Sequence, residues 1–228
     1  MTVPRETLVK IYRDMVRTRA LDEKLIELYH GKKLIVSWHS GMGQEGLCAV
    51  YSQLHSDDYC GYTHRGCYVW VCKGMSMREI LAEFAGKITG CAKGKGGTHI
   101  VSMKLGIFGR SGMQGGHFPL LTGAAKAIKL RGSDQIAVCS FGEGAATSGL
   151  MHEALNQAAI WRLPVLYLCE ANNFSESSRL EEVWAQPDIA KMAFPYNMAS
   201  ATVDGNDAIA VAEAAQEAIA HARSGKGP

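Results

Sequence analysis

The sequence predicts an α/β fold with a mostly parallel sheet. Two short apolar runs rich in β-branched side chains, residues 135–141 and 163–169, are typical of buried strands. Residues 149–162, which lie between them, place Leu and Ala at helical spacing. Because a strand, a helix and a strand in this order form a right-handed crossover, we expect the two strands to be parallel neighbours.

The other elements follow from periodicity and from the positions of Gly and Pro. Residues 5–30 carry apolar side chains at helical spacing and predict the longest helix. Ser76 and Glu79 have the spacing of a capping box at the start of another helix. Residues 89–116 are rich in glycine and lack periodicity, as functional or disordered loops often do. Further helices are predicted at 41–55, 76–86, 119–130, 188–193 and 206–223, a polar loop at 175–182, and further strands within 57–65 and at 199–203.

Length and composition indicate one globular domain over residues 1–228. The chain has 228 residues, of which 47% are hydrophobic, so it can bury a sizeable core. A formal net charge of +2 gives no electrostatic reason to expect nucleic acid or a membrane surface as a partner. Seven cysteines without a C-x-x-C pair argue against disulfides or zinc and for a reducing compartment. With neither a signal peptide nor a membrane-length apolar run in this sequence, we expect a cytoplasmic protein.

Two oxygen-bearing side chains follow the two central strands. Glu143 stands between Gly142 and Gly144 just after the first strand, and Asn172 follows the second. Carboxyl ends of parallel strands are where open α/β sheets bind ligands. Mg²⁺ prefers oxygen ligands and often keeps substrate phosphates in its shell. We therefore predict a magnesium ion holding a diphosphate, with Glu143, Asn172 and the backbone carbonyl of Phe174 as ligands.

Two other interpretations of this turn remain open. A glycine-rich turn between a strand and a helix also occurs in dinucleotide-binding folds, where Glu170 would take the position of the ribose-binding acid. The turn could equally be structural and hold no ligand. The segment containing Lys93 and Lys95, CAKGKGG, lacks the Walker spacing and is interpreted as a structural loop near the site.

Several segments together resemble one enzyme family. FGEGAATSGLMHEALNQAAIWRLPVLYLCEANNF is similar to the thiamine-diphosphate motif of the alpha subunit of 2-oxo-acid dehydrogenases, a family that includes the pyruvate, acetoin and branched-chain enzymes. SWHSGMGQEG, YTHRG, MSMREILAEFAGKITGCAKGKGGTHI, GMQGGHFPLLTGAA and TVDGNDAIAVAEAAQEAIAHARSGKGP occur in the order of the family. The resemblance covers almost the whole chain and implies a thiamine-diphosphate-binding fold with helices on both faces of the sheet.

The resemblance also implies roles for individual residues. His39 matches a family histidine near the substrate carboxylate and the reacting carbon, and is the expected catalytic residue. Arg65 is the expected diphosphate partner, since its planar fork can donate two charge-assisted hydrogen bonds. The residues implied in cofactor binding are His64, Arg65, Gly112, Gln114, Glu143, Gly144, Ala145 and Asn172.

The implied function is that of an alpha subunit that anchors thiamine diphosphate through Mg²⁺. The substrate would be a small 2-oxo acid or an acyloin. A beta subunit would complete the catalytic site in a heterotetramer of two alpha and two beta chains, with a lipoyl-bearing acyltransferase as a possible acceptor of the acyl group. Compared with the family, the chain is expected to lack a C-terminal segment. That difference keeps two alternatives open: a non-oxidative enzyme that forms or cleaves acyloins, and a non-catalytic structural subunit.

Overall fold

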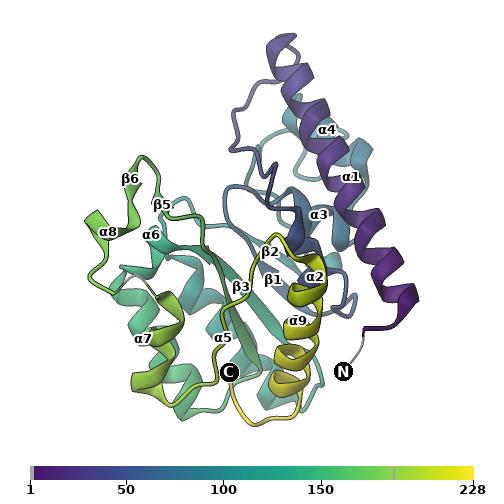
Figure 1. Ribbon diagram of the computed structural model, residues 1–228. Coiled ribbons are helices and arrows are strands. Elements are labelled where there is room, and N and C mark those ends of the chain that lie inside the picture. The colour runs from purple at the N-terminus through teal and green to yellow at the C-terminus, as the bar shows by residue number, and fades with distance from the viewer. Residues whose placement is uncertain (1–2, 187) are drawn as a thin grey trace. The chain divides into compact units, whose positions relative to one another are not determined.

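The computed structural model describes residues 3–186 and 188–228, and Figure 1 shows its ribbon. Contacts within the chain divide it into two compact units. The first runs through Asp57 and includes His64–Arg110 and Val203–Gln216. The second comprises Asp58–Thr63, Ser111–Thr202 and Glu217–Pro228. The expectation of a single domain over residues 1–228 stays a prediction.

The first unit is built on helix α1, Arg5–His30, which has the predicted bounds and is the long purple helix of Figure 1. Pro4 precedes it, and proline suits a helix start because its fixed φ is compatible with the first turn. The buried face of α1 mixes apolar and polar side chains: Ile11, Asp14, Thr18, Leu21, Asp22 and Leu25. Buried polar groups need hydrogen-bond partners, so this face must bond to neighbouring segments as well as pack against them.

Short elements complete the first unit. They are the 3₁₀ helix Glu45–Leu47, α2 (Cys48–Tyr51), α3 (Cys67–Cys72), α4 (Met77–Phe84), the 3₁₀ helix Met103–Leu105, β2 (Ile107–Gly109) and the first part of α9 (Ala208–Arg223). Helix α3 packs against α1 and α2. It was not predicted, because a short continuous apolar run shows no helical periodicity.

The second unit contains a parallel sheet of β1 (Tyr59–Gly61), β3 (Ala137–Gly142) and β4 (Val165–Glu170), with β3 in the middle. The register places Gly142 opposite Glu170 at the carboxyl ends of β3 and β4. Strand β3 is buried up to Phe141, whereas the inner residues of β4 are only half-buried. The predicted α/β fold with a parallel sheet is confirmed.

Helices pack against this sheet. Helix α5, His117–Arg131, contacts all three strands and also α7, Gly149–Ile160. The four-residue helix α6, Glu143–Ala146, directly follows β3 and contacts the hairpin strand β5, Phe174–Ser175. The remaining elements are β6 (Ser178–Arg179), α8 (Leu180–Val183) and the 3₁₀ helix Ile189–Tyr196.

Four local predictions are wrong. The polar loop predicted at 175–182 contains β6 and most of α8, because residues 174–179 form a short antiparallel hairpin. The helix predicted at 41–55 begins only at Glu45, because Gly43 has a φ of +91° and interrupts helical backbone. Ser76 is the N-cap residue of α4, but its side chain makes no cap hydrogen bond in this part of the structure, so the capping box with Glu79 does not form. Residues 199–203 form no strand, since they are exposed and have no strand partner within the described chain.

Membrane-spanning helices were not expected. Among the helices of residues 3–186 and 188–228, none is both long enough and apolar enough to cross a bilayer.

Candidate functional site

The turn between β3 and α6 in the second unit places a carboxylate inside the protein. Gly142 ends β3 and precedes α6, so Glu143 is the first residue of that helix. The Glu143 side chain is 0% exposed. Its Oε1 atom accepts the backbone N–H of Asn173 at 2.6 Å. Its Oε2 atom is also buried, yet finds no hydrogen-bond partner among the described residues.

An unsatisfied buried carboxylate oxygen is costly, since the desolvation of the group is not offset by a bond. In native proteins nearly every buried polar atom is bonded to another protein group, to water or to an ion. The Oε2 atom of Glu143 therefore fits a cation ligand. A structural turn without a ligand would leave that oxygen without a protein partner among the described residues.

The segment after β4 lies beside this carboxylate. Asn172 is half-buried, and its Oδ1 atom accepts the backbone N–H of Phe174 at 3.1 Å. Asn173, between them, has a φ of +66°. This Asx-type turn directs the Asn173 N–H to Glu143 and so joins the ends of β3 and β4. The predicted placement of Glu143 and Asn172 at adjacent strand ends agrees with the register, while their role as metal ligands stays a prediction.

Gly144 and Ala145 lie within α6. A Cβ atom on Gly144 would stand 2.3 Å from Oγ of Ser175, so the hairpin strand β5 leaves no room for a side chain there. At Gly142 a Cβ atom would meet nothing within 4 Å. Gly144 is therefore crowded by the Ser175 side chain, whereas Gly142 borders open space. Ala145 is buried at 4% exposure.

Gly112 and Gln114 precede α5 and are both exposed. Gly115, next to them, has a φ of +83°, and a Cβ atom there would stand 3.0 Å from Ser148. The chain can therefore turn into α5 at this point only with glycine. The predicted cofactor contacts of Gly112 and Gln114 stay predictions.

The histidines and the arginine predicted from the resemblance belong to the first unit. The rings of His39 and His64 meet edge to face, with centroids 5.1 Å apart and planes at 72°. His39 is exposed, whereas His64 and Arg65 are half-buried. A cavity of about 250 Å³ lies at this imidazole pair, lined by Ser37, Trp38, His39, His64, Thr98 and Arg110.

This cavity, called the imidazole pocket below, keeps His64 neutral. Burial, together with the smaller effects of the neighbouring Arg110, His39, Arg65 and His99, lowers the pKa of His64 to about 4. Burial and Arg110 also lower the pKa of His99. A neutral imidazole can accept a proton or a hydrogen bond, which is what a general base requires.

Sequence reasoning missed part of the pocket wall. An Nη2 atom of Arg110 donates to Oγ1 of Thr98 at 2.8 Å, and both residues line the cavity together with Trp38. Arg110 and Thr98 stand in the long glycine-rich segment, where no periodic pattern identifies an inward-facing side chain. The available signal was that Arg110 is the one arginine of this glycine-rich stretch.

The fold and the half-satisfied carboxylate define an α/β protein with a candidate cation site at the carboxyl ends of its strands. Comparison with known proteins gives its relationship. The chain belongs to the dehydrogenase E1 component family, whose model matches residues 12–228. This finding confirms the family predicted from the motifs and implies its cofactor, thiamine diphosphate.

Individual relatives are similar along almost the whole chain. The alpha subunit of acetoin:2,6-dichlorophenolindophenol oxidoreductase from Bacillus subtilis (strain 168) is 39% identical over 100% of this chain and 69% of its own length. The alpha subunit of the pyruvate dehydrogenase E1 component from Rhizobium meliloti (strain 1021) is 37% identical over 98% of this chain and 65% of its own length. The somatic mitochondrial form from Homo sapiens is 36% identical over 98% of this chain and 57% of its own length. The chain thus spans between 57% and 69% of these three relatives.

Proposed function

We propose that the chain is the alpha subunit of a thiamine-diphosphate-dependent dehydrogenase acting on a 2-oxo acid or on acetoin. The observation that carries the proposal is the buried Oε2 atom of Glu143, which has no hydrogen-bond partner among the described residues. Similarity to alpha subunits of pyruvate and acetoin enzymes supports the substrate class.

In this proposal the second unit holds Mg²⁺ and through it the diphosphate. Glu143 supplies a carboxylate oxygen, Asn172 an amide oxygen and Phe174 its backbone carbonyl. All three are hard oxygen donors, which Mg²⁺ prefers, and Mg²⁺ usually completes its shell with water and substrate phosphates. Gly144 and Ala145, which follow Glu143 in α6, are expected to contact the same cofactor group.

The other predicted residues have separate roles. Thiamine diphosphate, when bound, supplies a carbanion and an electron sink for cleavage next to a carbonyl group. Gly112 and Gln114 would hold its ring through the backbone. His64 and Arg65 would contact its phosphates. His39 is proposed as the catalytic residue that moves a proton near the substrate, since its ring meets the neutral imidazole of His64 at the pocket.

A beta subunit is the proposed partner, in a heterotetramer of two alpha and two beta chains, because the relatives are named as alpha subunits. A lipoyl-bearing acyltransferase is the proposed acceptor of the acyl group. A cytoplasmic location is proposed because the cysteines of the described chain are all free thiols.

Calorimetric titration of thiamine diphosphate tests the proposal. The titrant is added, with and without Mg²⁺, to the chain co-purified with its beta subunit. We expect saturable, Mg²⁺-dependent binding that Glu143→Ala weakens by at least about 100-fold, equivalent to roughly 2.7 kcal/mol. Glu153→Ala, at an exposed acid on α7, is the matched control and should bind like the wild type.

Failure of the folded wild-type complex to bind thiamine diphosphate would contradict the proposal and favour a non-catalytic subunit. If binding is observed, turnover of pyruvate and acetoin is measured with a lipoyl domain present. Acyl transfer to the lipoyl group supports the dehydrogenase, whereas release of a free acyloin or aldehyde would identify a non-oxidative enzyme.

A further inference from the structure

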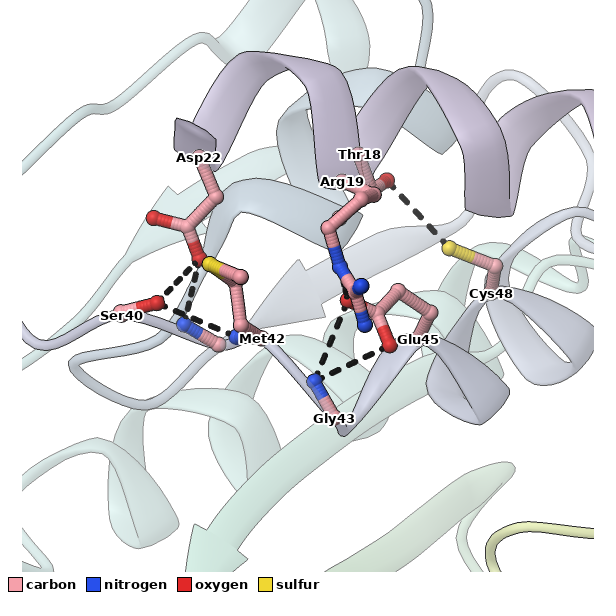
Figure 2. A network of polar contacts seen from close by, with 9 residues as sticks. Thr18, Arg19, Asp22, Ser40, Met42, Gly43, Glu45 and Cys48 are labelled. Carbon is pink, nitrogen blue, oxygen red and sulfur yellow. Dashed lines mark hydrogen bonds and ion pairs between the residues drawn. The ribbon is translucent and has the colours of Figure 1, made fainter. Parts of the chain in front are cut away.

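Asp22 is a buried carboxylate on α1 that is hydrogen-bonded to the residues on either side of His39, the predicted catalytic histidine. It is 1% exposed. Its Oδ1 atom accepts the indole N–H of Trp38 at 2.8 Å. Its Oδ2 atom accepts the hydroxyl of Ser40 at 2.9 Å and the backbone N–H of Gly41 at 2.6 Å. Figure 2 shows the bond between Asp22 and Ser40. His39 therefore stands between residues that are bonded to the same carboxylate.

The segment beyond Gly41 is bonded to α1 at Arg19, which lies about one helical turn before Asp22. Arg19 donates to Oε1 of Glu45 at 2.6 Å, and both carboxylate oxygens of Glu45 accept the backbone N–H of Gly43 at 3.2 and 3.1 Å (Figure 2). The Oγ atom of Ser40 also accepts the backbone N–H of Met42 at 3.2 Å. Side chains of α1 thus hold both ends of the segment from Trp38 to Glu45, which carries His39.

Glu83, near the end of α4, holds the opposite loop of the imidazole pocket in the same way. It is 0% exposed. Its Oε2 atom accepts the backbone N–H groups of Ala92 at 2.7 Å and Gly94 at 3.0 Å. Its Oε1 atom accepts those of Gly96 at 2.7 Å and Gly97 at 3.3 Å. Thr98, which lines the pocket and bonds to Arg110, is the next residue.

This arrangement explains Gly94 of the CAKGKGG segment and Gly90, which directly precedes that segment. A Cβ atom on Gly94 would stand 2.4 Å from the backbone of Gly86, and one on Gly90 would stand 2.6 Å from the Glu83 backbone. The loop must therefore wrap closely around α4. Its N–H donors point at the chain's own carboxylate, which agrees with the prediction that this segment is structural and binds no external anion.

Both carboxylates accept several donors: three in the case of Asp22 and four in the case of Glu83. For Glu83, burial alone would raise the pKa, but the four backbone N–H donors outweigh it and the pKa is lowered. A neutral amide at either position would set an N–H₂ group against existing donors. Charge-assisted bonds are about twice as strong as neutral ones, so each loop is held in a single conformation.

We propose that Asp22 and Glu83 are positioning residues, which hold the two loops of the imidazole pocket so that His39 and the Thr98–Arg110 pair face the same cavity. Asp22 fixes the loop that carries His39. Glu83 fixes the loop that ends at Thr98. The kinetic consequence of this proposal rests on the proposed function, whereas the structural consequence does not.

Hydrogen–deuterium exchange of the complex with the beta subunit tests the structural consequence. In Asp22→Asn we expect exchange of the backbone amides at residues 38–43 to accelerate by at least about tenfold, the factor given by 1.4 kcal/mol. In Glu83→Gln the same acceleration is expected at residues 91–98. Each variant should leave the other loop close to its wild-type rate.

Asp14→Asn is the matched control for Asp22. Asp14 is a buried carboxylate on the same helix, 5% exposed, and its Oδ2 atom accepts the Ser52 hydroxyl at 2.8 Å. Its loss should lower stability without accelerating exchange in either loop. Trp38→Phe serves if Asp22→Asn fails to fold, because it removes the indole N–H donor and keeps an aromatic ring beside Tyr29 and Phe84.

Steady-state kinetics with the accepted 2-oxo acid or acyloin supply the second readout. Since a misplacement of about 1 Å can cost about 100-fold in rate, we expect Asp22→Asn to lower kcat by about 10- to 100-fold. The KM for thiamine diphosphate should change less than about twofold, and Asp14→Asn should keep the wild-type kcat. Equal losses in Asp22→Asn and Asp14→Asn would overturn the positioning role.

The two readouts separate the two proposals. Accelerated exchange at residues 38–43 in a complex that turns over no substrate supports the positioning role and contradicts the proposed function alone. Unchanged exchange in folded Asp22→Asn and Trp38→Phe proteins overturns the positioning role, whatever the enzyme's activity.

Discussion

Two regions of the molecule, the walls of the imidazole pocket and the turn after β3, hold buried carboxylates in different ways. In the first unit, both oxygens of Glu83 accept backbone N–H groups, and both oxygens of Asp22 accept donors from the loop around His39. In the second unit, Glu143 is just as buried, yet only Oε1 has a partner among the described residues. The difference separates an acid that completes the fold from an acid that is ready for a ligand.

The physical reason is the cost of desolvation. A buried carboxylate that receives several charge-assisted bonds recovers the hydration it loses, so Asp22 and Glu83 stabilise the loops they hold. A buried oxygen without a partner keeps that cost in the ligand-free protein. In the proposed function, a divalent cation would supply the interaction that Oε2 of Glu143 lacks among the described residues.

The largest expected effect is the loss of folding stability caused by Glu83→Gln. Glu83→Gln replaces one acceptor oxygen by an N–H₂ group that faces two backbone N–H donors, so we expect the free energy of unfolding to fall by about 2–4 kcal/mol. Urea denaturation followed by circular dichroism measures this change. Glu79→Gln, at an exposed position of the same helix, should stay within about 0.5 kcal/mol of the wild type. Equal effects of the two substitutions would contradict the view that the hydrogen bonds to Glu83 stabilise the fold.

Glu143→Gln should have the opposite profile. Without ligands it replaces an oxygen that already lacks a partner, so we expect the free energy of unfolding to change by less than about 1 kcal/mol. With Mg²⁺ and thiamine diphosphate at about 100 times the dissociation constant, the wild type should gain about 2.7 kcal/mol and the variant almost nothing. Thermal denaturation of both proteins, with and without the two ligands, compares them directly. A large loss of stability in the ligand-free variant would mean that Glu143 is structural.

The glycines around Glu143 provide a smaller effect. Gly144→Ala places a Cβ atom against Ser175, and overpacking of this kind typically costs about 1–3 kcal/mol. Gly142→Ala is the matched control, because a Cβ atom there meets nothing within 4 Å and the φ of −94° suits alanine. In chemical denaturation, Gly144→Ala should therefore have a clearly lower free energy of unfolding than Gly142→Ala. Similar stabilities of the two variants would mean that Ser175 in β5 can move aside without a measurable loss of stability.

The smallest expected effect concerns pH and the buried His117. Its Nε2 atom lies 2.6 Å from the Ser140 carbonyl oxygen and must donate, which leaves a buried Nδ1 atom without a partner in the described chain. Burial lowers the pKa of His117 below its usual 6.5, with the bond to Ser140 acting in the other direction. The folded state then binds fewer protons than the unfolded state below pH 6.5. The contribution of His117 to the free energy of unfolding is therefore fully present above pH 6.5 and declines as the solution becomes more acidic.

His117→Gln isolates this contribution, since its amide can still donate to the Ser140 carbonyl but does not titrate. Free energies of unfolding measured between pH 7.5 and pH 5 should decline less steeply in the variant than in the wild type. Part of the slope should remain, because the pKa of His64 is also lowered, to about 4. Its contribution to the free energy of unfolding therefore declines over the same pH range. Identical slopes would show that His117 does not control the acid sensitivity.

Much of the secondary structure could be predicted because it depends on local patterns. Helix α1 has the predicted bounds, since a long amphipathic repeat determines its period and Pro4 determines its start. The strands β3 and β4 and the helix α7 between them follow from β-branched runs and a helical repeat. Short elements were less predictable, as the apolar run of α3 shows, because a few residues cannot display a period.

The candidate site was predicted only in part. Glu143 and Asn172 could be identified because the parallel register brings the ends of successive strands together. Their difference from Asp22 and Glu83 could not, since hydrogen-bond satisfaction depends on which distant backbone groups arrive at each oxygen. Nothing near Glu83 in the sequence shows that it accepts donors from Ala92 and Gly96.

By itself the sequence determined the α/β class, the family and the order of the main elements, because periodicity, turn residues and motifs act over short distances. The tertiary structure alone decided which acids are saturated, which glycines are forced by close packing, and which residues join His39 and His64 around a cavity. Those properties arise from contacts between segments far apart in the chain. Burial and hydrogen bonding act on atoms that are neighbours in space, and the sequence does not display those neighbours.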